Sequence, residues 1–172
     1  YIEETLKVLP KYLSENNSRT GIYSIQPSNL KPEIVRVEVK TSKFGSIHKN
    51  GDELVMLIDI NMPFQLSNMN LSIQIFNSRE RAVIYTYAFD VQNPLLRKTG
   101  IQRYKCTIPK CRLYQDEYYL KLYLAESKGK ENFKTLARIC SFEVQMIDRN
   151  IEWGWPKDAC IYTEDFFWEE LL

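Results

Sequence analysis

The sequence predicts an all-β fold, an antiparallel β-sandwich with a short N-terminal helix and an aromatic C-terminal tail. Two segments indicate strands most clearly, because apolar side chains recur in them at every second position. One segment contains Tyr104, Cys106 and Ile108, and the other contains Tyr118, Leu120, Leu122 and Leu124. Such spacing predicts strands with one face in a core and the other face free. The 11 Tyr and 8 Phe residues agree with this, since aromatic residues are enriched in strands.

The first 16 residues are predicted to form the helix. Apolar residues recur there at helical spacing: Ile2, Leu6, Leu9 and Leu13. Pro10 has no backbone N–H and is expected to kink this helix. Residues 17–32 are predicted to be a linker, since Pro27 and Pro32 interrupt regular structure there.

From Glu33 onward, alternating apolar positions predict seven strands with no helix between them. Their ranges are 33–40, 54–62, 71–76, 82–89, 101–109, 117–125 and 135–147. The segment Lys49–Asp52 contains Asn-Gly and predicts a tight turn, and the neighbouring His48 is expected to be a solvated loop residue. Seven short strands at close spacing indicate a sandwich.

The composition and the missing motifs exclude several classes of function. A net charge of +1 with 26% charged residues does not indicate a nucleic-acid partner. No apolar run is long enough for a transmembrane helix, and the N-terminus has no signal-peptide pattern. The sequence contains no G-x-x-x-x-G-K-S/T, G-x-G-x-x-G or H-E-x-x-H motif, so neither a cofactor nor a metal is predicted. Because the chain begins with Tyr1, we expect it to be part of a longer protein.

The cysteines do not have the spacing of a metal site. Cys106 and Cys111 are five positions apart, Cys140 and Cys160 are isolated, and His48 is the single histidine. Cys106 and Cys140 lie on apolar strand faces, which favours reduced thiols in a reducing compartment. A disulfide is the alternative.

The strand predicted over 117–125 has a second face that is free of the core. Tyr119, Lys121 and Tyr123 alternate on that face. Aromatic rings with polar groups between them suit a binding surface better than a reaction centre. This pattern predicts a recognition module built on the sandwich.

Four short motifs, taken together and in order, resemble those of one family. They are Arg19-Thr-Gly21 (R-x-G), Gly51-Asp-Glu-Leu54 (G-D-x-L), Ile108-Pro109 with Leu113 and Tyr118 or Tyr119 (I-P-x-x-x-L-x-x-G-x-Y), and Ser141-Phe-Glu-Val144 in the closing strand. The family they resemble is the Wzt-type C-terminal domain of the ATP-binding subunit of polysaccharide ABC exporters. The likeness is best over residues 19–147. The sequence departs from the family at Asp116 and Glu117, where the family has a glycine before its tyrosine.

The resemblance implies an Ig-like sandwich, without catalytic activity, that recognises an exported glycan near its non-reducing end. It also implies three parts: a connector helix and linker from an ATPase domain (1–30), the glycan-binding sandwich (31–150), and a tail that can be exchanged in a dimer (151–172). The implied partners are a lipid-linked, O-antigen-like polysaccharide, a second copy of the chain, and a transmembrane exporter subunit reached through the ATPase domain. The implied location is the cytoplasm, at the inner membrane.

With that function, the expected glycan-binding residues are aromatic and polar strand positions: Asp59, Asn61, Gln74, Tyr85, Tyr87, Tyr119, Lys121 and Tyr123. We expect Asp59, Asn61 and Gln74 to lie beside Tyr119, Lys121 and Tyr123 on one solvent-facing sheet. Sugar rings pack their C–H faces on aromatic rings, and their hydroxyls exchange water for polar side chains. Two alternatives remain. One is an Ig-like protein-interaction or dimerisation module with no glycan ligand. The other is a glycosidase in which Asp59 pairs with a second carboxylate.

The tail leaves a further alternative open. Trp153, Trp155 and the run from Phe166 to Trp168 crowd aromatic rings into the last 22 residues. That much apolar surface is expected to be covered. Either the tail caps its own sandwich, or it packs on a second copy through exchange in a two-fold dimer.

Overall fold

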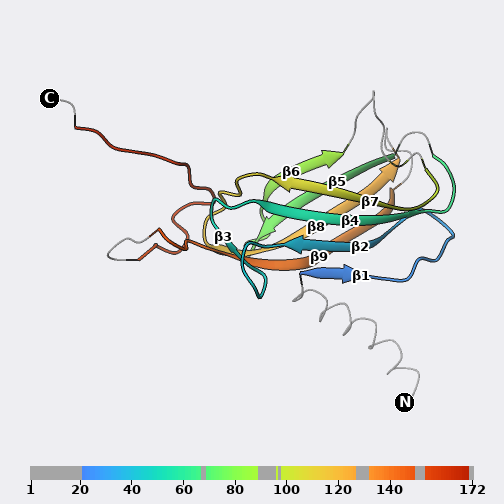
Figure 1. Cartoon of the computed structure of the whole chain (residues 1–172), viewed down its shortest axis with the longest axis horizontal. Helices are drawn as coiled ribbons and strands as arrows, with labels where there is room; N and C mark the ends of the chain where they lie inside the picture. Colours follow the sequence, from blue (N-terminus) through green and yellow to red (C-terminus); the bar gives the residue numbers. More distant parts are fainter. Residues whose placement is uncertain are drawn as a thin grey trace, which may run out of the picture.

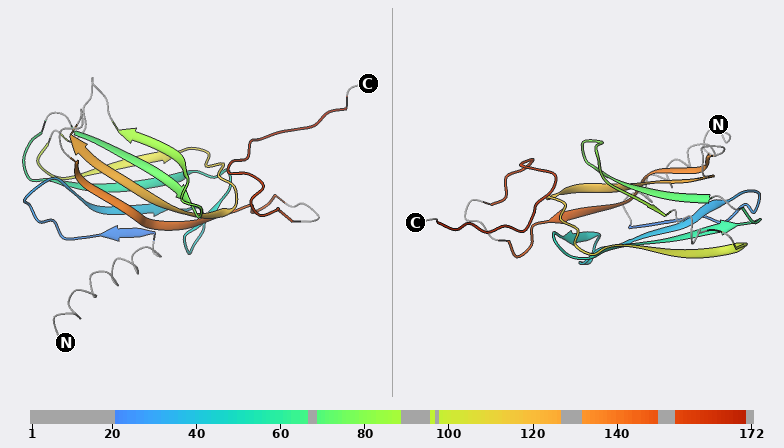
Figure 2. Two further views of the ribbon diagram at one scale, coloured as in Figure 1. Left: turned by 180° about the vertical axis from the view of Figure 1, so that it is seen from behind. Right: turned by 90° about the horizontal axis from the view of Figure 1, so that it is seen from above.

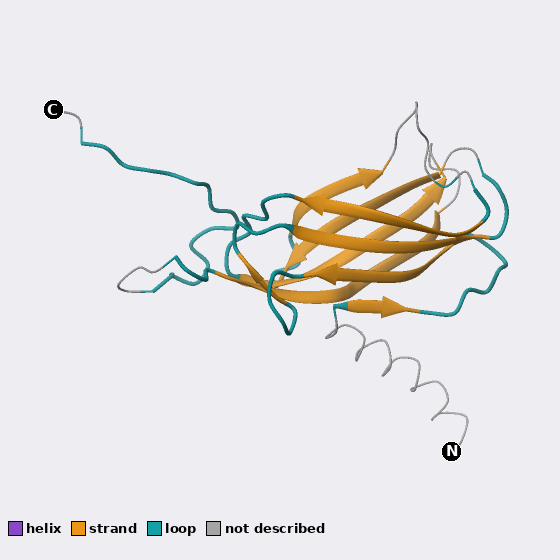
Figure 3. Ribbon diagram, in the orientation of Figure 1, coloured by secondary structure: helices purple, strands orange, loops and turns teal. Residues whose placement is uncertain are grey.

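The computed structural model describes residues 21–66, 69–88, 96, 98–126, 132–149 and 154–170. These residues contain nine strands joined by loops and turns (Figures 1 and 3). The strands are β1 (Ile22–Ser24), β2 (Glu33–Lys40), β3 (Ile47–Lys49), β4 (Leu54–Met62), β5 (Met69–Asn77), β6 (Ala82–Ala88), β7 (Gly100–Ile108), β8 (Asp116–Glu126) and β9 (Asn132–Gln145). The helix predicted over residues 1–16 lies outside the described residues.

The strands form two sheets that lie face to face, as the second view in Figure 2 shows. The four-stranded sheet has the order β1-β2-β4-β7, and the five-stranded sheet has the order β3-β9-β8-β5-β6. Neighbouring strands are antiparallel, except that β3 runs parallel to β9. The prediction of an all-β sandwich is therefore confirmed.

The seven predicted strands correspond to β2 and to β4 through β9. The structure adds β1 and β3, each of 3 residues. β1 lies within the predicted linker and pairs with β2, and β3 lies within the predicted loop and pairs with β9. Three residues are too few to show a period-two pattern, so the sequence carried no signal for either strand.

The core lies between the two sheets and follows the predicted faces. The inward residues of β8 are Tyr118, Leu120, Leu122 and Leu124, each 1% exposed or less. Those of β4 are Leu54, Met56, Ile58, Ile60 and Met62, which are equally buried. The alternate residues of β8 are partly exposed on the opposite face. The predicted register of both strands is confirmed.

The prediction that His48 is a solvated loop residue is wrong. His48 lies in β3 and is 0% exposed. Its Nδ1 accepts the Ser42 backbone N–H at 3.2 Å, and its Nε2 lies 3.3 Å from the carbonyl oxygen of Asp52. The parallel pairing of β3 with β9 buries the ring, and this long-range contact is invisible in the local sequence.

All four cysteines are free thiols, as predicted. Cys111 and Cys140 are buried, Cys106 is half-buried and Cys160 is exposed. Burial raises the pKa of the Cys111 thiol to about 11 and that of Cys140 to about 12. These two thiols are therefore protonated near neutral pH and have little nucleophilic character.

A break in regular pairing along β9 shapes the outer face of the five-stranded sheet. The register with β8 shifts between Tyr118 and Leu120 and again between Leu120 and Leu122. Opposite these two shifts, Cys140 and Arg138 have positive φ values of 52° and 53°. β-Bulges re-aim side chains in this way. Cys140 is directed into the core, while Arg138 reaches the ring of Tyr119 on the outer face.

The described part of the tail first packs on its own chain and then leaves it. The Tyr114 hydroxyl donates to the Pro156 carbonyl oxygen at 2.6 Å, and Leu113 forms a β-bridge with Tyr162. Arg112 forms ion pairs with the side chains of Glu164 and Asp165. Beyond these contacts the chain runs away from the sandwich (Figure 1). Phe166, Phe167 and Trp168 are 71%, 88% and 93% exposed.

Candidate functional site

The outer face of the five-stranded sheet carries six of the eight predicted site residues. Strand pairing sets them in rows: Tyr85 lies opposite Gln74, which lies opposite Lys121 on β8. In the next row along the strands, Tyr87 and Tyr123 flank Ser72 of β5. On the other side of the Gln74 and Lys121 row, Phe76 lies opposite Tyr119. We call this surface the aromatic face; it consists of Gln74, Phe76, Tyr85, Tyr87, Tyr119, Lys121 and Tyr123.

Ring contacts organise the aromatic face. Phe76 and Tyr119 stack with centroids 5.5 Å apart and an interplanar angle of 11°. Tyr85 and Tyr87 lie along one strand with centroids 6.0 Å apart. The Lys121 ammonium lies 5.0 Å from the Tyr123 centroid and 5.8 Å from that of Phe76. The ammonium is therefore held between two rings.

One end of the aromatic face is tied by polar contacts within the chain. The Tyr119 hydroxyl donates to Glu80 Oε2 at 2.9 Å. Arg138 lies over the Tyr119 ring, 5.3 Å from its centroid, and forms an ion pair with Glu80. A hollow of about 540 Å³ adjoins this cluster, and its lining includes Ser46, Ser141 and Glu143. These contacts hold Tyr119 in place at the edge of the hollow.

The middle of the aromatic face differs, because its polar groups have no partner within the described residues. No hydrogen bond or ion pair joins the side chains of Gln74, Tyr85, Tyr87, Lys121 or Tyr123 to another described residue. Tyr85 and Tyr87 are 60% and 67% exposed. The rows therefore offer flat rings together with an amide, an ammonium and three hydroxyls that a ligand can engage.

Asp59 and Asn61 lie elsewhere, on β4 of the four-stranded sheet. Their residues are 7% and 5% exposed. Asn61 Nδ2 donates to Asn29 Oδ1 at 2.8 Å. The expectation that these two residues lie beside Tyr119 and Tyr123 is wrong. Alternation along a strand identifies which residues share a face of that strand, but not the sheet to which the strand belongs.

Asp59 does not fit the general-acid role of the glycosidase alternative. Its Oδ1 and Oδ2 accept hydrogen bonds from Arg103 Nε at 2.6 Å and Nη2 at 2.8 Å. The Arg103 guanidinium holds the pKa of the Asp59 carboxyl below its usual range. A general acid in glycoside hydrolysis needs the opposite shift of its pKa.

Sequence reasoning missed two members of the outer face, Phe76 and Arg138. Phe76 has the same parity as Gln74 along β5, so the alternation contained the signal for it. Arg138 reaches the face through the irregular register of β9. No local pattern predicts that irregularity.

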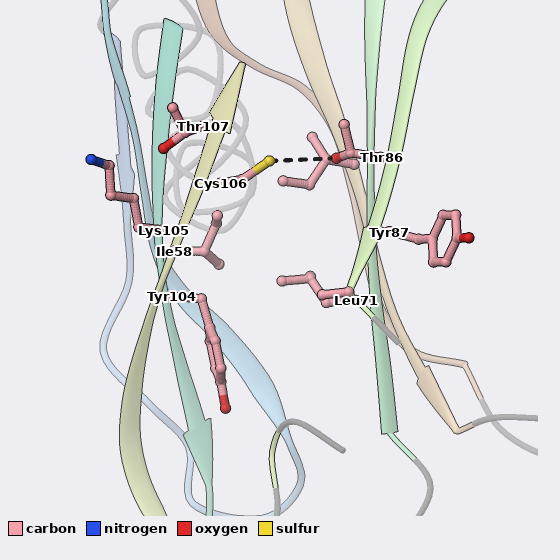
Figure 4. Close-up of a pocket in the computed structure, with 10 residues that line it drawn as sticks. Ile58, Leu71, Thr86, Tyr87, Tyr104, Lys105, Cys106 and Thr107 are labelled. Carbon is pink, nitrogen blue, oxygen red and sulfur yellow. Dashed lines mark hydrogen bonds between the residues drawn. The ribbon is translucent and has the colours of Figure 1, made fainter. Parts of the chain in front are cut away.

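A second cavity, a cleft of about 310 Å³, lies between the sheets near β6 and β7. Figure 4 shows Ile58 and Cys106 directed towards Leu71 and Thr86 of the other sheet, with Tyr104 lying along their side of the cleft. Cys106 Sγ donates a weak hydrogen bond to Thr86 Oγ1 at 3.8 Å. The side chain of Tyr87 is directed away from this cleft. The cleft is thus mainly apolar, and few of its groups match a hydroxyl-rich ligand.

The described residues contain no group of three or more His, Cys, Asp and Glu side chains that could hold a metal ion. A search of the same residues finds no helix with the length and apolar character needed to cross a membrane.

Comparison with known proteins shows a similar fold among solved structures. No family model and no curated protein matches the sequence. Among solved structures, the C-terminal domain of Wzt matches with a TM-score of 0.61 and 12% sequence identity, over 87% of this chain and 94% of that chain. At this identity the match shows a shared fold and leaves the ligand open.

Two further solved structures are much less similar. The β-glucuronidase of Parabacteroides merdae matches with a TM-score of 0.37 and 11% identity, over 72% of this chain and 14% of that chain. The alkylpurine DNA glycosylase AlkC of Pseudomonas fluorescens matches with a TM-score of 0.41 and 10% identity, over 80% of this chain and 36% of that chain. These scores are too low to assign either fold, or its activity, to this chain.

Proposed function

We propose that this chain is a non-catalytic carbohydrate-binding domain that recognises a lipid-linked polysaccharide for ABC-type export. One observation carries the proposal: the aromatic face presents rings on the outer side of the sheet, together with polar groups that have no partner among the described residues. The shared fold with the C-terminal domain of Wzt supports the exporter setting.

The chemistry of the aromatic face matches that of a sugar chain. A pyranose ring has an apolar C–H face, which packs on a tyrosine or phenylalanine ring. Its hydroxyls both donate and accept, as do the tyrosine hydroxyls and the Gln74 amide. Since these groups have no described partner, a glycan displaces only water from them. An open sheet also leaves room for a chain of several sugars, which a closed pocket would not.

The wider organisation is part of the proposal. Residues 1–30 act as a connector from an ATPase domain, residues 31–150 form the glycan-binding sandwich, and residues 151–172 form the tail. The domain acts in the cytoplasm beside the inner membrane and presents an O-antigen-like glycan to the transmembrane exporter subunit. Two copies act together, because an ABC exporter contains two ATPase subunits.

Calorimetry with the polysaccharide of the source cell, delipidated, tests the proposal. We expect Tyr87→Ala and Tyr123→Ala each to weaken binding about five- to tenfold, since loss of one stacked ring costs on the order of 1–1.5 kcal/mol. Phe64→Ala is the matched control, because Phe64 is an exposed aromatic residue (44%) after β4, outside the aromatic face. Equal affinities for all three variants and the parent chain would reject the aromatic face as the site.

One observation favours the alternative function, a protein-interaction or dimerisation module. Phe166, Phe167 and Trp168 expose three neighbouring aromatic side chains on the tail. Exposed apolar patches of this kind mark contact surfaces. Under this alternative the chain binds no glycan, and changes on the aromatic face leave its association with a partner unaltered.

A further inference from the structure

We propose that the aromatic face selects a glycan that carries a negatively charged group, a carboxylate or a phosphate, and that Lys121 binds this group. The inference rests on the proposed function and narrows its substrate class.

Lys121 lies in the middle row of the aromatic face, on the central strand of the five-stranded sheet. It lies on β8, which has β5 on one side and β9 on the other, and it is half-buried. The rings of Phe76 and Tyr123 hold its ammonium at 5.8 Å and 5.0 Å from their centroids. A lysine that served only solubility would extend into water. This one lies against rings on which a sugar would stack.

The charge of Lys121 has no counter-ion within the described residues. Some other lysines do have one: Lys49 Nζ lies 2.8 Å from Asp148, and Lys40 Nζ lies 3.5 Å from Glu38. The nearby carboxylate of Glu80 is already engaged by Arg138 and by the Tyr119 hydroxyl. A positive charge therefore remains at the middle of the aromatic face.

Hydrogen-bond donors lie beside the Lys121 ammonium and, together with it, form a site for an anionic group. Gln74 lies directly opposite Lys121, and Tyr85 lies directly opposite Gln74. The Gln74 amide and the Tyr85 hydroxyl have no partner in the described part of the chain. An ammonium, an amide N–H and a phenol O–H together match the oxygens of a carboxylate or phosphate. Carboxylate and phosphate oxygens both accept hydrogen bonds from these groups, so the experiment must distinguish the two anions.

The outer face of the other sheet lacks this arrangement, although it also carries cations. Arg103 is bound to Asp59 at 2.6 Å, and Arg36 is bound to Glu38 at 2.9 Å. Those guanidinium groups already have a carboxylate partner. Lys105 on β7 also has no ion pair among the described residues, but no ring contact is described for it. What distinguishes the aromatic face is an unpaired cation held against rings.

Paired oligosaccharides test the inference by calorimetry. One pair is an oligogalacturonate and the same chain after its carboxyl groups are reduced; the other is a phosphorylated oligomannoside and its dephosphorylated form. We expect one acidic member to bind about tenfold or more tightly than its neutral match, because hydrogen bonds to charged groups are the stronger ones. The preference should shrink between about 0.05 and 0.5 M NaCl, since salt screens exposed charges. The pair that shows the preference identifies the anionic group.

Three variants test whether Lys121 causes the preference for the acidic oligosaccharide. Lys121→Gln should remove it, so that the acidic and neutral members bind with equal affinity, while Lys121→Arg should keep it. Lys105→Gln is the matched control, because Lys105 lies on β7 of the other sheet. A preference that survives Lys121→Gln, or equal binding of the acidic and neutral members by the parent chain, overturns the inference. Binding of neutral glycans alone would leave the proposed function standing, whereas failure to bind any glycan would overturn both.

Discussion

The buried side chain of Asn50 donates a hydrogen bond to Thr163 Oγ1 at 3.0 Å and thereby ties the tail to the sandwich. The same amide also donates to the Leu113 carbonyl oxygen at 2.7 Å. Its Oδ1 is buried without a partner among the described residues. The turn before β4, the loop before β8 and the tail therefore meet at one side chain.

This junction predicts unequal effects of two substitutions. Asn50→Ala should destabilise the chain by about 1–3 kcal/mol, because it leaves the buried Leu113 carbonyl oxygen unpaired. Thr163→Val should cost less, about 0.5–1.5 kcal/mol, since Asn50 keeps its bond to Leu113. Urea unfolding followed by tryptophan fluorescence measures both. A larger loss for Thr163→Val would mean that the tail contact, and not the loop contact, stabilises this end of the sandwich.

The register of β8 makes a second prediction. Leu122→Ala should cost about 2–5 kcal/mol, because Leu122 is fully buried between the sheets. Tyr123→Ala should cost well under half as much, since its ring lies on the partly exposed outer face. Chemical denaturation of the two variants gives the comparison. The reverse order would require a register shifted by one residue, which exchanges the two faces of the strand.

His48 predicts a loss of stability in mild acid. Burial lowers the pKa of its imidazole below the ordinary value, which is about 6.5 in an unfolded chain. The unfolded state therefore binds more protons below about pH 6.5. The free energy of unfolding should fall as the pH drops through that value and stop falling once the folded-state pKa is passed.

The sequence offers a clean control for the histidine effect, because it contains 1 His. His48→Gln should be less stable than the parent at pH 7.5, and its stability should change less between pH 7 and pH 5. Urea unfolding over this pH range measures both. An unchanged pH dependence in His48→Gln would assign the effect to carboxyl groups instead.

Sequence patterns predicted the strands more completely than they predicted the site. The inward faces of β4 and β8 followed from period-two spacing, because one buried face imposes that spacing on a long strand. The same spacing placed Tyr119, Lys121 and Tyr123 together. The spacing did not show that Asp59 lies on a different sheet from these three residues, because the assignment of β4 to the other sheet depends on long-range pairing.

Features that depend on irregular or very short pairing were out of reach. The burial of His48 depends on the three-residue strand β3. The position of Arg138 over Tyr119 depends on the broken register of β9. Neither feature produces a periodic pattern in the sequence, because each involves too few residues.

The last prediction concerns assembly and follows from the two halves of the tail. The first half is held by its own chain, through Arg112 and through the Tyr114 contact with Pro156. The second half is not, since Phe166, Phe167 and Trp168 are 71–93% exposed. Three such rings in water are unfavourable, and burying a large aromatic side chain contributes about 1.5–3 kcal/mol. We therefore expect a homodimer in which these three rings pack on a second copy.

Light scattering at high micromolar concentration tests the dimer. The triple variant Phe166→Ser, Phe167→Ser, Trp168→Ser should be monomeric and fully folded, because it keeps the anchoring contacts of Arg112 and Tyr114. Deletion of residues 151–172 should also abolish the dimer, but with a loss of stability or aggregation, because it removes those contacts as well. An intact chain that remains monomeric would show that the exposed rings serve another partner, and a triple variant that remains dimeric would move the interface to another surface.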